Sequence, residues 1–135
     1  MTEIDTYLEA LKLKLVTSAV VSQYTIVKER ATTTDGYLRV QITLSNGDFL
    51  EMTEYFVHSQ RKIKTVDYRY QWMDATKRHL KRRWDNTAHH PEIPNFPHHI
   101  HEGSEDHVVE GKRLNISQVL DMLEILLTDA QHQTT

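Results

Sequence analysis

Apolar side chains near the N-terminus recur at the spacing of a helix. These residues are Ile4, Leu8, Leu11 and Leu15, and each follows the previous one by three or four positions. This spacing places them on one face of an amphipathic helix over residues 3 to about 15. Thr2, followed three residues later by Asp5, resembles a capping box. The pattern therefore predicts an N-terminal helix that packs one face against the rest of the protein.

The chain then changes to the composition and period of strands. From Val20 to Thr34 it is rich in β-branched and aromatic residues, which predicts a first strand. After the Asp35-Gly36 turn, apolar and polar residues alternate, as in a strand with one buried face. The alternating apolar residues are Leu38, Val40, Ile42 and Leu44.

The Asn46-Gly47 turn sets the register of a hairpin. A two-residue loop would place Glu51 opposite Ile42 and mix polar with apolar side chains on one face. A three-residue loop with Gly47 left-handed pairs Ile42 with Leu50 instead, so we favour the bulged hairpin. The face that this register makes uniformly apolar consists of Leu38, Val40, Ile42, Leu44, Leu50, Met52 and Phe56.

Two further strands, a loop and a helix complete the prediction. A strand is expected over residues 63–73 and a fifth over residues 79–85, whereas residues 86–107 lack periodicity and are predicted to form a long loop. The alternating side chains of the fourth strand are Val66, Tyr68, Tyr70 and Trp72. Asn115 with Gln118 caps a second amphipathic helix. Its apolar stripe is Ile116, Val119, Leu120, Leu123 and Leu127.

The order of these elements predicts an α+β fold of two layers. An N-terminal helix, an antiparallel meander of about five strands, a His/Pro-rich loop and a C-terminal helix suit a sheet with one helix-covered face. At 135 residues, the chain fits one domain over residues 1–130, with residues 131–135 as a frayed tail.

Composition removes several classes of protein. The chain has no cysteine, which excludes disulfides, thiolate metal sites and a cysteine nucleophile. It has no apolar run long enough to span a bilayer, and its first residues lack the plan of a signal peptide, so we expect a cytoplasmic protein. No glycine-rich phosphate loop, dinucleotide fingerprint or serine-hydrolase elbow is present, which argues against ATP, NAD and serine-hydrolase chemistry.

Charge is distributed unevenly. The formal net charge is −3, but residues 61–83 hold nine Lys/Arg against two Asp, a net +7, so the remainder carries −10. A basic surface on an acidic body fits a phosphate-bearing partner such as RNA. The side chains that we expect to bind substrate are Arg69, Lys81, Arg82 and Arg83. The same charges can also be only the solvated face of two strands.

The histidines are the most informative residues. Six of the nine fall within residues 89–107. His99 and His101 project to one side of an extended chain and His98 to the other. In the preceding strand, Trp84 is expected in the core, which leaves Lys81, Arg83 and Asp85 facing the histidines. A His-rich loop can also be a solvated surface with no chemistry.

These residues carry a resemblance to a known family. The sequence is similar to the TumE family of toxins from prokaryotic toxin–antitoxin pairs, over most of the chain. The motifs that carry the resemblance are Tyr68-Arg69-Tyr70-Gln71-Trp72, Arg83-Trp84-Asp85-Asn86, His89-His90-Pro91-Glu92 and Phe96-Pro97-His98-His99-Ile100-His101. Members often carry His before the Trp of the first motif, where this chain has Gln71.

The resemblance implies a toxin that is neutralised by a cognate antitoxin, and together with the basic segment it suggests cleavage of RNA. His99 and His101 are the expected acid–base pair, with His90 in reserve. Asp85 would orient an imidazole, and Arg83, with Lys81, would stabilise charge on the phosphorane. This version needs no cofactor.

Two alternatives remain open. A divalent metal could be held by His90, His99, His101 and Asp85 for metal-dependent phosphoester cleavage. The chain could also be a non-catalytic module that binds nucleic acid or a partner protein. Formation of a homodimer would cover the exposed edge of the sheet.

Overall fold

The fold is a long antiparallel sheet with two helices. The computed structural model of the chain describes residues 1–133. In chain order, the elements are α1 (Glu3–Thr17), β1 (Val21–Ala31), β2 (Asp35–Leu44), β3 (Phe49–Ser59), β4 (Lys62–Met73), β5 (Leu80–Asp85), β6 (His99–Glu102), β7 (Val108–Glu110) and α2 (Ile116–Gln133). The strands pair in sequence order, so the sheet is a meander. The predicted α+β class and the order of helix, sheet and helix are confirmed.

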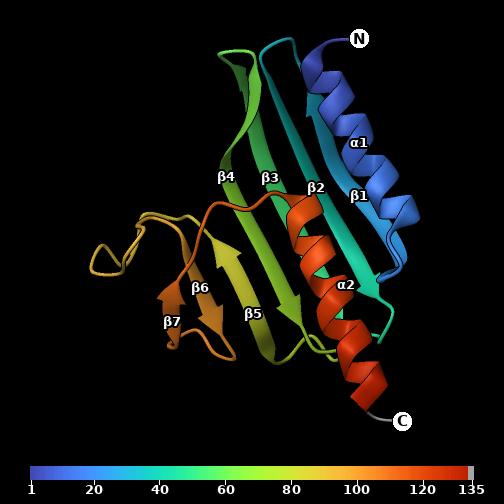
Figure 1. Cartoon of the computed structure of the whole chain (residues 1–135), viewed down its shortest axis with the longest axis vertical. Helices are drawn as coiled ribbons and strands as arrows, with labels where there is room; N and C mark the ends of the chain where they lie inside the picture. Colours follow the sequence, from blue (N-terminus) through green and yellow to red (C-terminus); the bar gives the residue numbers. More distant parts are fainter. Residues whose placement is uncertain (134–135) are drawn as a thin grey trace.

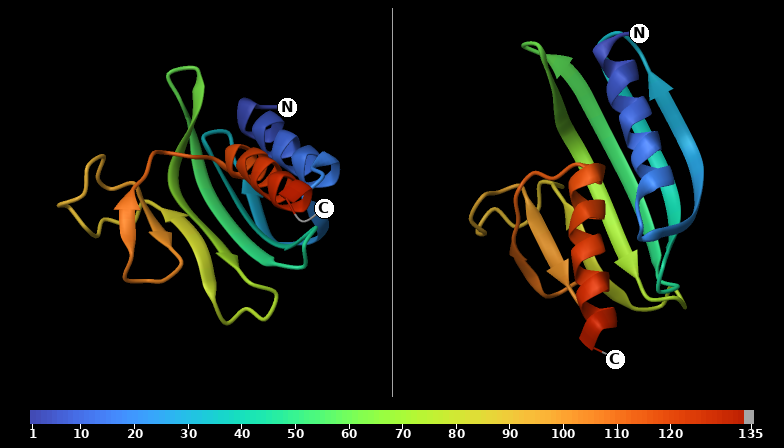
Figure 2. Two further views of the ribbon diagram at one scale, coloured as in Figure 1. Left: turned by 60° about the horizontal axis from the view of Figure 1, so that its bottom comes forward. Right: turned by 45° about the vertical axis from the view of Figure 1, so that its right-hand side comes forward.

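Both helices cover the same face of the sheet. Figure 1 shows α1 and α2 side by side in front of the strands. The sheet curves around them, as the left view of Figure 2 shows. The core lies between these layers, and within residues 1–133 the opposite face carries no helix. We call these two sides the helix-covered face and the open face.

Alternation along the central strands supplies the core, and the predicted hairpin register is confirmed. Ile42 pairs with Leu50, and Gly47 has a φ of 90°, the left-handed conformation that the three-residue loop needs. All seven side chains assigned to the apolar face are buried. One polar side chain, Glu54, shares that face and is fully buried too.

Local capping fixes the start of each helix. At α1, Asp5 N–H donates to Thr2 Oγ1 (3.2 Å) while Thr2 N–H donates to the Asp5 carboxylate (3.0 Å), the expected capping box. At α2, Asn115 and Gln118 exchange the equivalent bonds, of 2.8 and 2.9 Å. Neither helix of the described chain is both long and apolar enough to cross a membrane.

The predicted loop over residues 86–107 contains two additional strands, so the sheet has seven strands rather than about five. β6 and β7 are only four and three residues long. They pair with β5 and with each other, although neither has an apolar alternation that would reveal it. α2 continues to Gln133, so residues 131–133 are helical, and the rest of the predicted frayed tail lies outside the described residues.

Two β-bulges shift side chains from their predicted faces. Between β3 and β4, Tyr55 pairs with Asp67 and Phe56 with Thr65, which leaves Val66 unpaired and buries Thr65 instead. Between β4 and β5, Trp72 pairs with Arg82 and Met73 with Leu80, which leaves Lys81 unpaired and moves it from its predicted face. The simple alternation that the sequence predicts therefore fails at both points.

Candidate functional site

The open face of β5 and β6 carries the predicted polar cluster. Trp84 points into the core and is 1% exposed, so its neighbours Arg83 and Asp85 point to the open face. Across the β5–β6 pairing, Asp85 lies opposite His99 and Arg83 opposite His101. Because paired residues project from the same face, these four side chains meet.

The Asp85 carboxylate is the centre of the cluster. It is 3% exposed. Oδ1 accepts a hydrogen bond from the Thr87 N–H (3.0 Å) and lies 2.9 Å from His99 Nε2. Oδ2 accepts from Arg83 Nε (3.1 Å) and lies 3.7 Å from His101 Nε2. Asp85 thus faces the histidines, as the sequence predicts, and it also contacts the Arg83 guanidinium.

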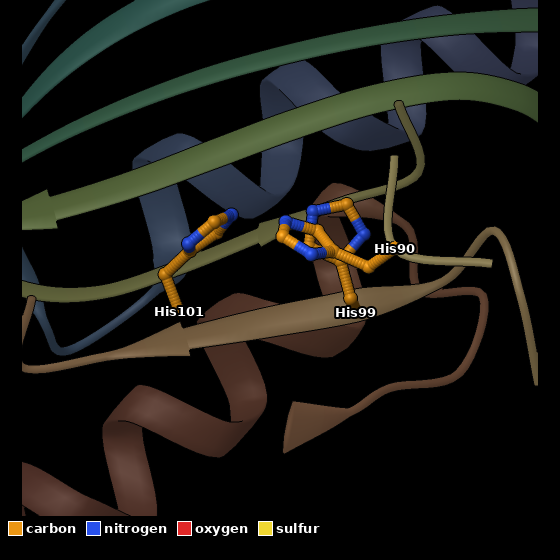
Figure 3. Close-up of side chains that lie close together, drawn as sticks. All are labelled: His90, His99 and His101. Atoms are coloured by element: carbon orange, nitrogen blue, oxygen red, sulfur yellow. The ribbon is translucent and has the colours of Figure 1, made fainter. Parts of the chain in front are cut away.

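His99 and His101 stand on the same side of β6, with ring centroids 4.9 Å apart (Figure 3). In each ring Nδ1 lies 2.9 Å from a backbone carbonyl oxygen, that of Pro97 for His99 and that of Glu105 for His101. Both rings are almost completely buried. Burial lowers the pKa of His101 below its usual range.

His90 reaches the pair from the loop that follows β5 (Figure 3). Its ring centroid lies 5.3 Å from that of His99 and 6.0 Å from that of His101. One ring nitrogen of each of the three histidines lies within 4.8 Å of the others. Together with Asp85, these side chains could hold a metal ion, which is the donor set named by the metal alternative.

Arg83 is held by two further side chains of the open face. Its Nη1 and Nη2 donate to the two Glu105 oxygens at 2.7 and 2.6 Å, a bidentate pair. Nη1 also donates to Gln71 Oε1 (3.2 Å). Glu105 raises the pKa of Arg83, and Arg83 lowers the pKa of Glu105. The Glu105 side chain is 64% exposed, so this partner can be displaced from Arg83.

The structure does not bring all predicted basic residues to the site. Lys81 and Arg82 both lie against aromatic rings of the helix-covered face, Lys81 over Trp72 and Arg82 over Trp84. Lys81 forms an ion pair with Asp48 (2.7 Å) and Arg82 with Glu102. The prediction that Lys81 shares a face with Arg83 is wrong, because the irregularity between β4 and β5 pairs Trp72 with Arg82 and Met73 with Leu80 and skips Lys81.

Arg69 lies beside the cluster on the open face. It donates to Gln71 Oε1 (3.1 Å), the same oxygen that accepts from Arg83. The Gln71 side-chain oxygen therefore links two guanidinium groups. Arg69 also lines a hollow of about 670 Å³ on the open face, together with Asn86.

His98 points to the other side of the chain, as predicted. Its Nδ1 lies 2.9 Å from the Tyr68 hydroxyl oxygen. Burial lowers the pKa of His98. The Tyr68 hydroxyl also donates to the Lys112 carbonyl (3.2 Å), so His98 belongs to the packing between β4 and the segment before α2.

Sequence reasoning missed Glu105 and the backbone groups around the cluster. Glu105 lies in the turn between β6 and β7, with no motif or periodicity to mark it. The carbonyls of Pro97 and Glu105 and the amide of Thr87 could not be assigned without the course of the backbone. The only sequence signal for Glu105 was that an acidic residue lies close to the histidines in the chain.

Comparison with known proteins identifies the family. A family model described as Toxin TumE matches residues 9–133, nearly the whole chain, including every member of the cluster. Neither curated proteins nor solved structures gave a significant match. The family match confirms the resemblance seen in the sequence motifs, and a toxin of this kind implies a cognate antitoxin as its partner. The chain therefore belongs to the TumE family of toxins, the toxin components of toxin–antitoxin pairs.

Proposed function

We propose that this toxin is an endoribonuclease whose reaction takes place at the cluster of Arg83, Asp85, His90, His99 and His101. The observation that carries the proposal is the convergence of these side chains around the buried Asp85 carboxylate, with a guanidinium alongside. Imidazoles supply proton transfer or metal ligation, and a guanidinium stabilises charge on a phosphoryl group. Proton transfer and stabilisation of the charged phosphoryl group both favour cleavage of a phosphodiester.

In the acid–base version, one imidazole of the His99–His101 pair removes the proton of the ribose 2′-OH, and the 2′-oxygen attacks the adjacent phosphorus. The other protonates the departing 5′-oxygen, which leaves a 2′,3′-cyclic phosphate. His90 is the more exposed of the three histidines and is the reserve for either role. Asp85, 2.9 Å from His99 Nε2, orients that ring.

Arg83 is the group that we expect to bind the scissile phosphate. Its two terminal nitrogens are aligned with a carboxylate, and a phosphate offers two oxygens in a similar fork. Glu105 occupies this position from an exposed turn. An incoming RNA phosphate would replace Glu105 on Arg83 while Nε of Arg83 continues to donate to Asp85.

Arg69 and the adjacent hollow of the open face are the expected path of the RNA strand. The hollow is lined by Arg69, Tyr37 and Asn86, side chains that can bind a phosphate, stack on a base and donate hydrogen bonds. Lys81 and Arg82 do not contribute, since both are paired on the helix-covered side. The substrate-binding surface is therefore narrower than the basic segment of the sequence.

The test is cleavage of a labelled RNA by the untagged protein, in excess EDTA and, separately, with added Zn²⁺ or Mn²⁺. We expect cleavage by the wild type in at least one condition and none by His99→Ala/His101→Ala. The matched control is His79→Ala, which removes an exposed histidine from the β4–β5 turn and should cleave like the wild type.

The cleavage products and the conditions that give them distinguish the acid–base, metal-dependent and binding-only hypotheses. A 2′,3′-cyclic phosphate formed in EDTA supports the acid–base version, and cleavage only with added metal supports metal-dependent chemistry at the same residues. Absence of cleavage in every condition would contradict the ribonuclease proposal. If RNA still bound with a steep salt dependence in that case, the chain would be a binding module.

A further inference from the structure

The side chains around the Asp85 carboxylate have the geometry of a metal site. We infer that His90, His99 and His101, with Asp85, bind one divalent transition-metal ion through ring nitrogens and a carboxylate oxygen. The inference rests on the proposed function only for the role of the ion in RNA cleavage. Binding itself is argued from the positions of the side chains and is tested separately.

The ligand atoms come together from three segments of the chain. Asp85 ends β5. Figure 3 shows His99 and His101 on one side of β6 and His90 entering from the loop between the two strands. The three histidines each place a ring nitrogen within 4.8 Å of the others. With bonds of about 2.1 Å, ligands on one ion lie no more than about 4.2 Å apart, so a bound ion would draw these rings slightly closer.

The second nitrogen of each buried ring is held in the manner of a metal-bound histidine. Nδ1 of His99 lies 2.9 Å from the Pro97 carbonyl oxygen, and Nδ1 of His101 lies 2.9 Å from that of Glu105. A histidine that binds metal through Nε2 usually donates its other N–H to such an oxygen, which fixes the ring orientation. Both Nε2 atoms then face the Asp85 carboxylate.

His99 has an acceptor at both of its ring nitrogens. Nδ1 faces the Pro97 carbonyl and Nε2 faces Asp85 Oδ1, each at 2.9 Å. A neutral imidazole has one N–H and can satisfy only one of these oxygens. One of the two oxygens therefore lacks a donor unless a further proton or a metal ion lies between His99 Nε2 and Asp85 Oδ1.

His101 brings a second ring nitrogen to the Asp85 carboxylate. Its Nε2 lies 3.7 Å from Asp85 Oδ2, beyond hydrogen-bond distance, and the residue is 5% exposed. A proton between His99 and Asp85 would link only those two side chains. One ion placed among the three rings and Asp85 would serve His99 and His101 together, with His90 as a third nitrogen ligand.

The donor set selects the class of metal. Three imidazole nitrogens and one carboxylate oxygen suit Zn²⁺ and neighbouring transition metals, whereas Mg²⁺ and Ca²⁺ prefer oxygen ligands. With four protein ligands in place, a water or phosphate oxygen would bind as a fifth ligand, a coordination number that catalytic Zn²⁺ can adopt. In the proposed reaction, it would polarise the phosphate or activate a bound hydroxide next to Arg83.

The experiment is a metal titration of the untagged full chain after treatment with a chelator. We expect one equivalent of Zn²⁺ or Co²⁺ to bind in calorimetry, visible absorption bands to appear with Co²⁺, and Mg²⁺ to give no signal. His99→Ala and His101→Ala should each weaken binding at least about 100-fold, more than the loss of an outer-shell partner costs. His79→Ala is the matched control and should bind like the wild type.

His99 and His101 are buried, so circular dichroism must verify that their variants fold. His90→Ala provides the test if they do not, because this half-buried loop residue is removed without opening the core, and it should weaken binding by at least about tenfold. Failure of the wild type to bind Zn²⁺ and Co²⁺, or unchanged binding in folded cluster variants, would overturn the inference.

The metal inference and the ribonuclease proposal can fail independently. Stoichiometric metal binding without RNA cleavage would contradict the ribonuclease proposal and leave the metal site intact. Cleavage of RNA by a chain that binds no metal would do the reverse, and would favour the acid–base version.

Discussion

The two faces of the sheet each bury one carboxylate, and their surroundings differ. Glu54 lies on the helix-covered face and is fully buried, whereas Asp85 lies on the open face and is 3% exposed. A buried charge is costly unless hydrogen bonds or opposite charges compensate it. The way in which each carboxylate is compensated distinguishes a structural group from a candidate site.

Glu54 is surrounded by uncharged donors that complete its hydrogen bonds. Oε2 accepts from the Tyr7 hydroxyl (2.6 Å) and the Thr65 hydroxyl (3.0 Å), and Oε1 accepts from the Ile116 N–H (3.0 Å). Tyr7 belongs to α1, Thr65 to β4 and Ile116 starts α2. Glu54 therefore joins both helices to the sheet, and its partner in each of these contacts is a hydrogen-bond donor.

Asp85 faces imidazole nitrogens as well as N–H donors. Arg83 and the Thr87 N–H donate to it, and Oδ1 also lies 2.9 Å from Nε2 of His99, a ring whose other nitrogen already faces a carbonyl. An arrangement that is completed only by a further proton or a metal ion is a weaker structural contact and a better candidate binding site. The comparison teaches that burial alone does not mark function, whereas an incomplete set of partners does.

The largest effect expected separates two adjacent residues. Trp84→Ala should lower the free energy of unfolding by about 3–5 kcal/mol, because it removes a fully buried aromatic side chain from the core. Asp85→Asn should cost less than about 1.5 kcal/mol, since an amide oxygen can still accept from the Thr87 N–H and Arg83 keeps Glu105. Urea unfolding monitored by circular dichroism measures both.

The comparison between these variants is made in EDTA, so that a bound ion does not add to the stability of the wild type. An Asp85→Asn variant destabilised as much as Trp84→Ala would mean that the open-face cluster is structural. Asp85 would then be a structural carboxylate like Glu54, and the two faces would not differ in this respect.

A smaller, pH-dependent effect is expected at Glu54. Burial raises its pKa in the folded protein above the unfolded value of about 4.3. The stabilising contribution of the protonated carboxyl is fully present below about pH 4.3 and is lost as the pH rises through the folded pKa. Glu54→Gln does not titrate, so its stability relative to the wild type should increase over this range and then level off.

Urea unfolding of wild type and Glu54→Gln at a series of pH values measures this difference. Glu51→Gln is the matched control, since Glu51 is a half-buried glutamate on the open face of the same strand. A difference between wild type and Glu54→Gln that stays constant with pH would show that the carboxylate is fully compensated as an anion.

The features that the sequence predicted depend on local periodicity. The hairpin register follows from alternation at positions such as Ile42 and Leu50, and the two helix starts follow from residues three apart. The same alternation also pointed to Glu54, which lies between Met52 and Phe56 on the apolar face. The sequence analysis did not name Glu54 on this face, because alternation of apolar residues does not show whether a carboxylate there finds the donors that it needs to be buried.

The features that could not be predicted depend on contacts between distant segments. β6 and β7 exist because β5 offers an edge, and strands of three or four residues with His and Val contain too few positions for a period to show. Glu105 reaches Arg83 across a turn with no local signal. For the site, the sequence could nominate Asp85, His90, His99 and His101 but could not orient their nitrogens.

The smallest effect expected is at Lys81, the basic residue that the sequence wrongly placed with Arg83. Lys81→Ala should cost about 1 kcal/mol of stability, because its partner Asp48 also accepts from Trp72 Nε1 (3.0 Å) and the Lys81 side chain is 42% exposed. It should leave RNA cleavage unchanged, whereas Arg83→Lys should lower cleavage because lysine loses the bidentate fork. The cleavage assay of the two variants decides this. Equal losses would mean that total positive charge governs the reaction, and that the face on which each cation lies does not.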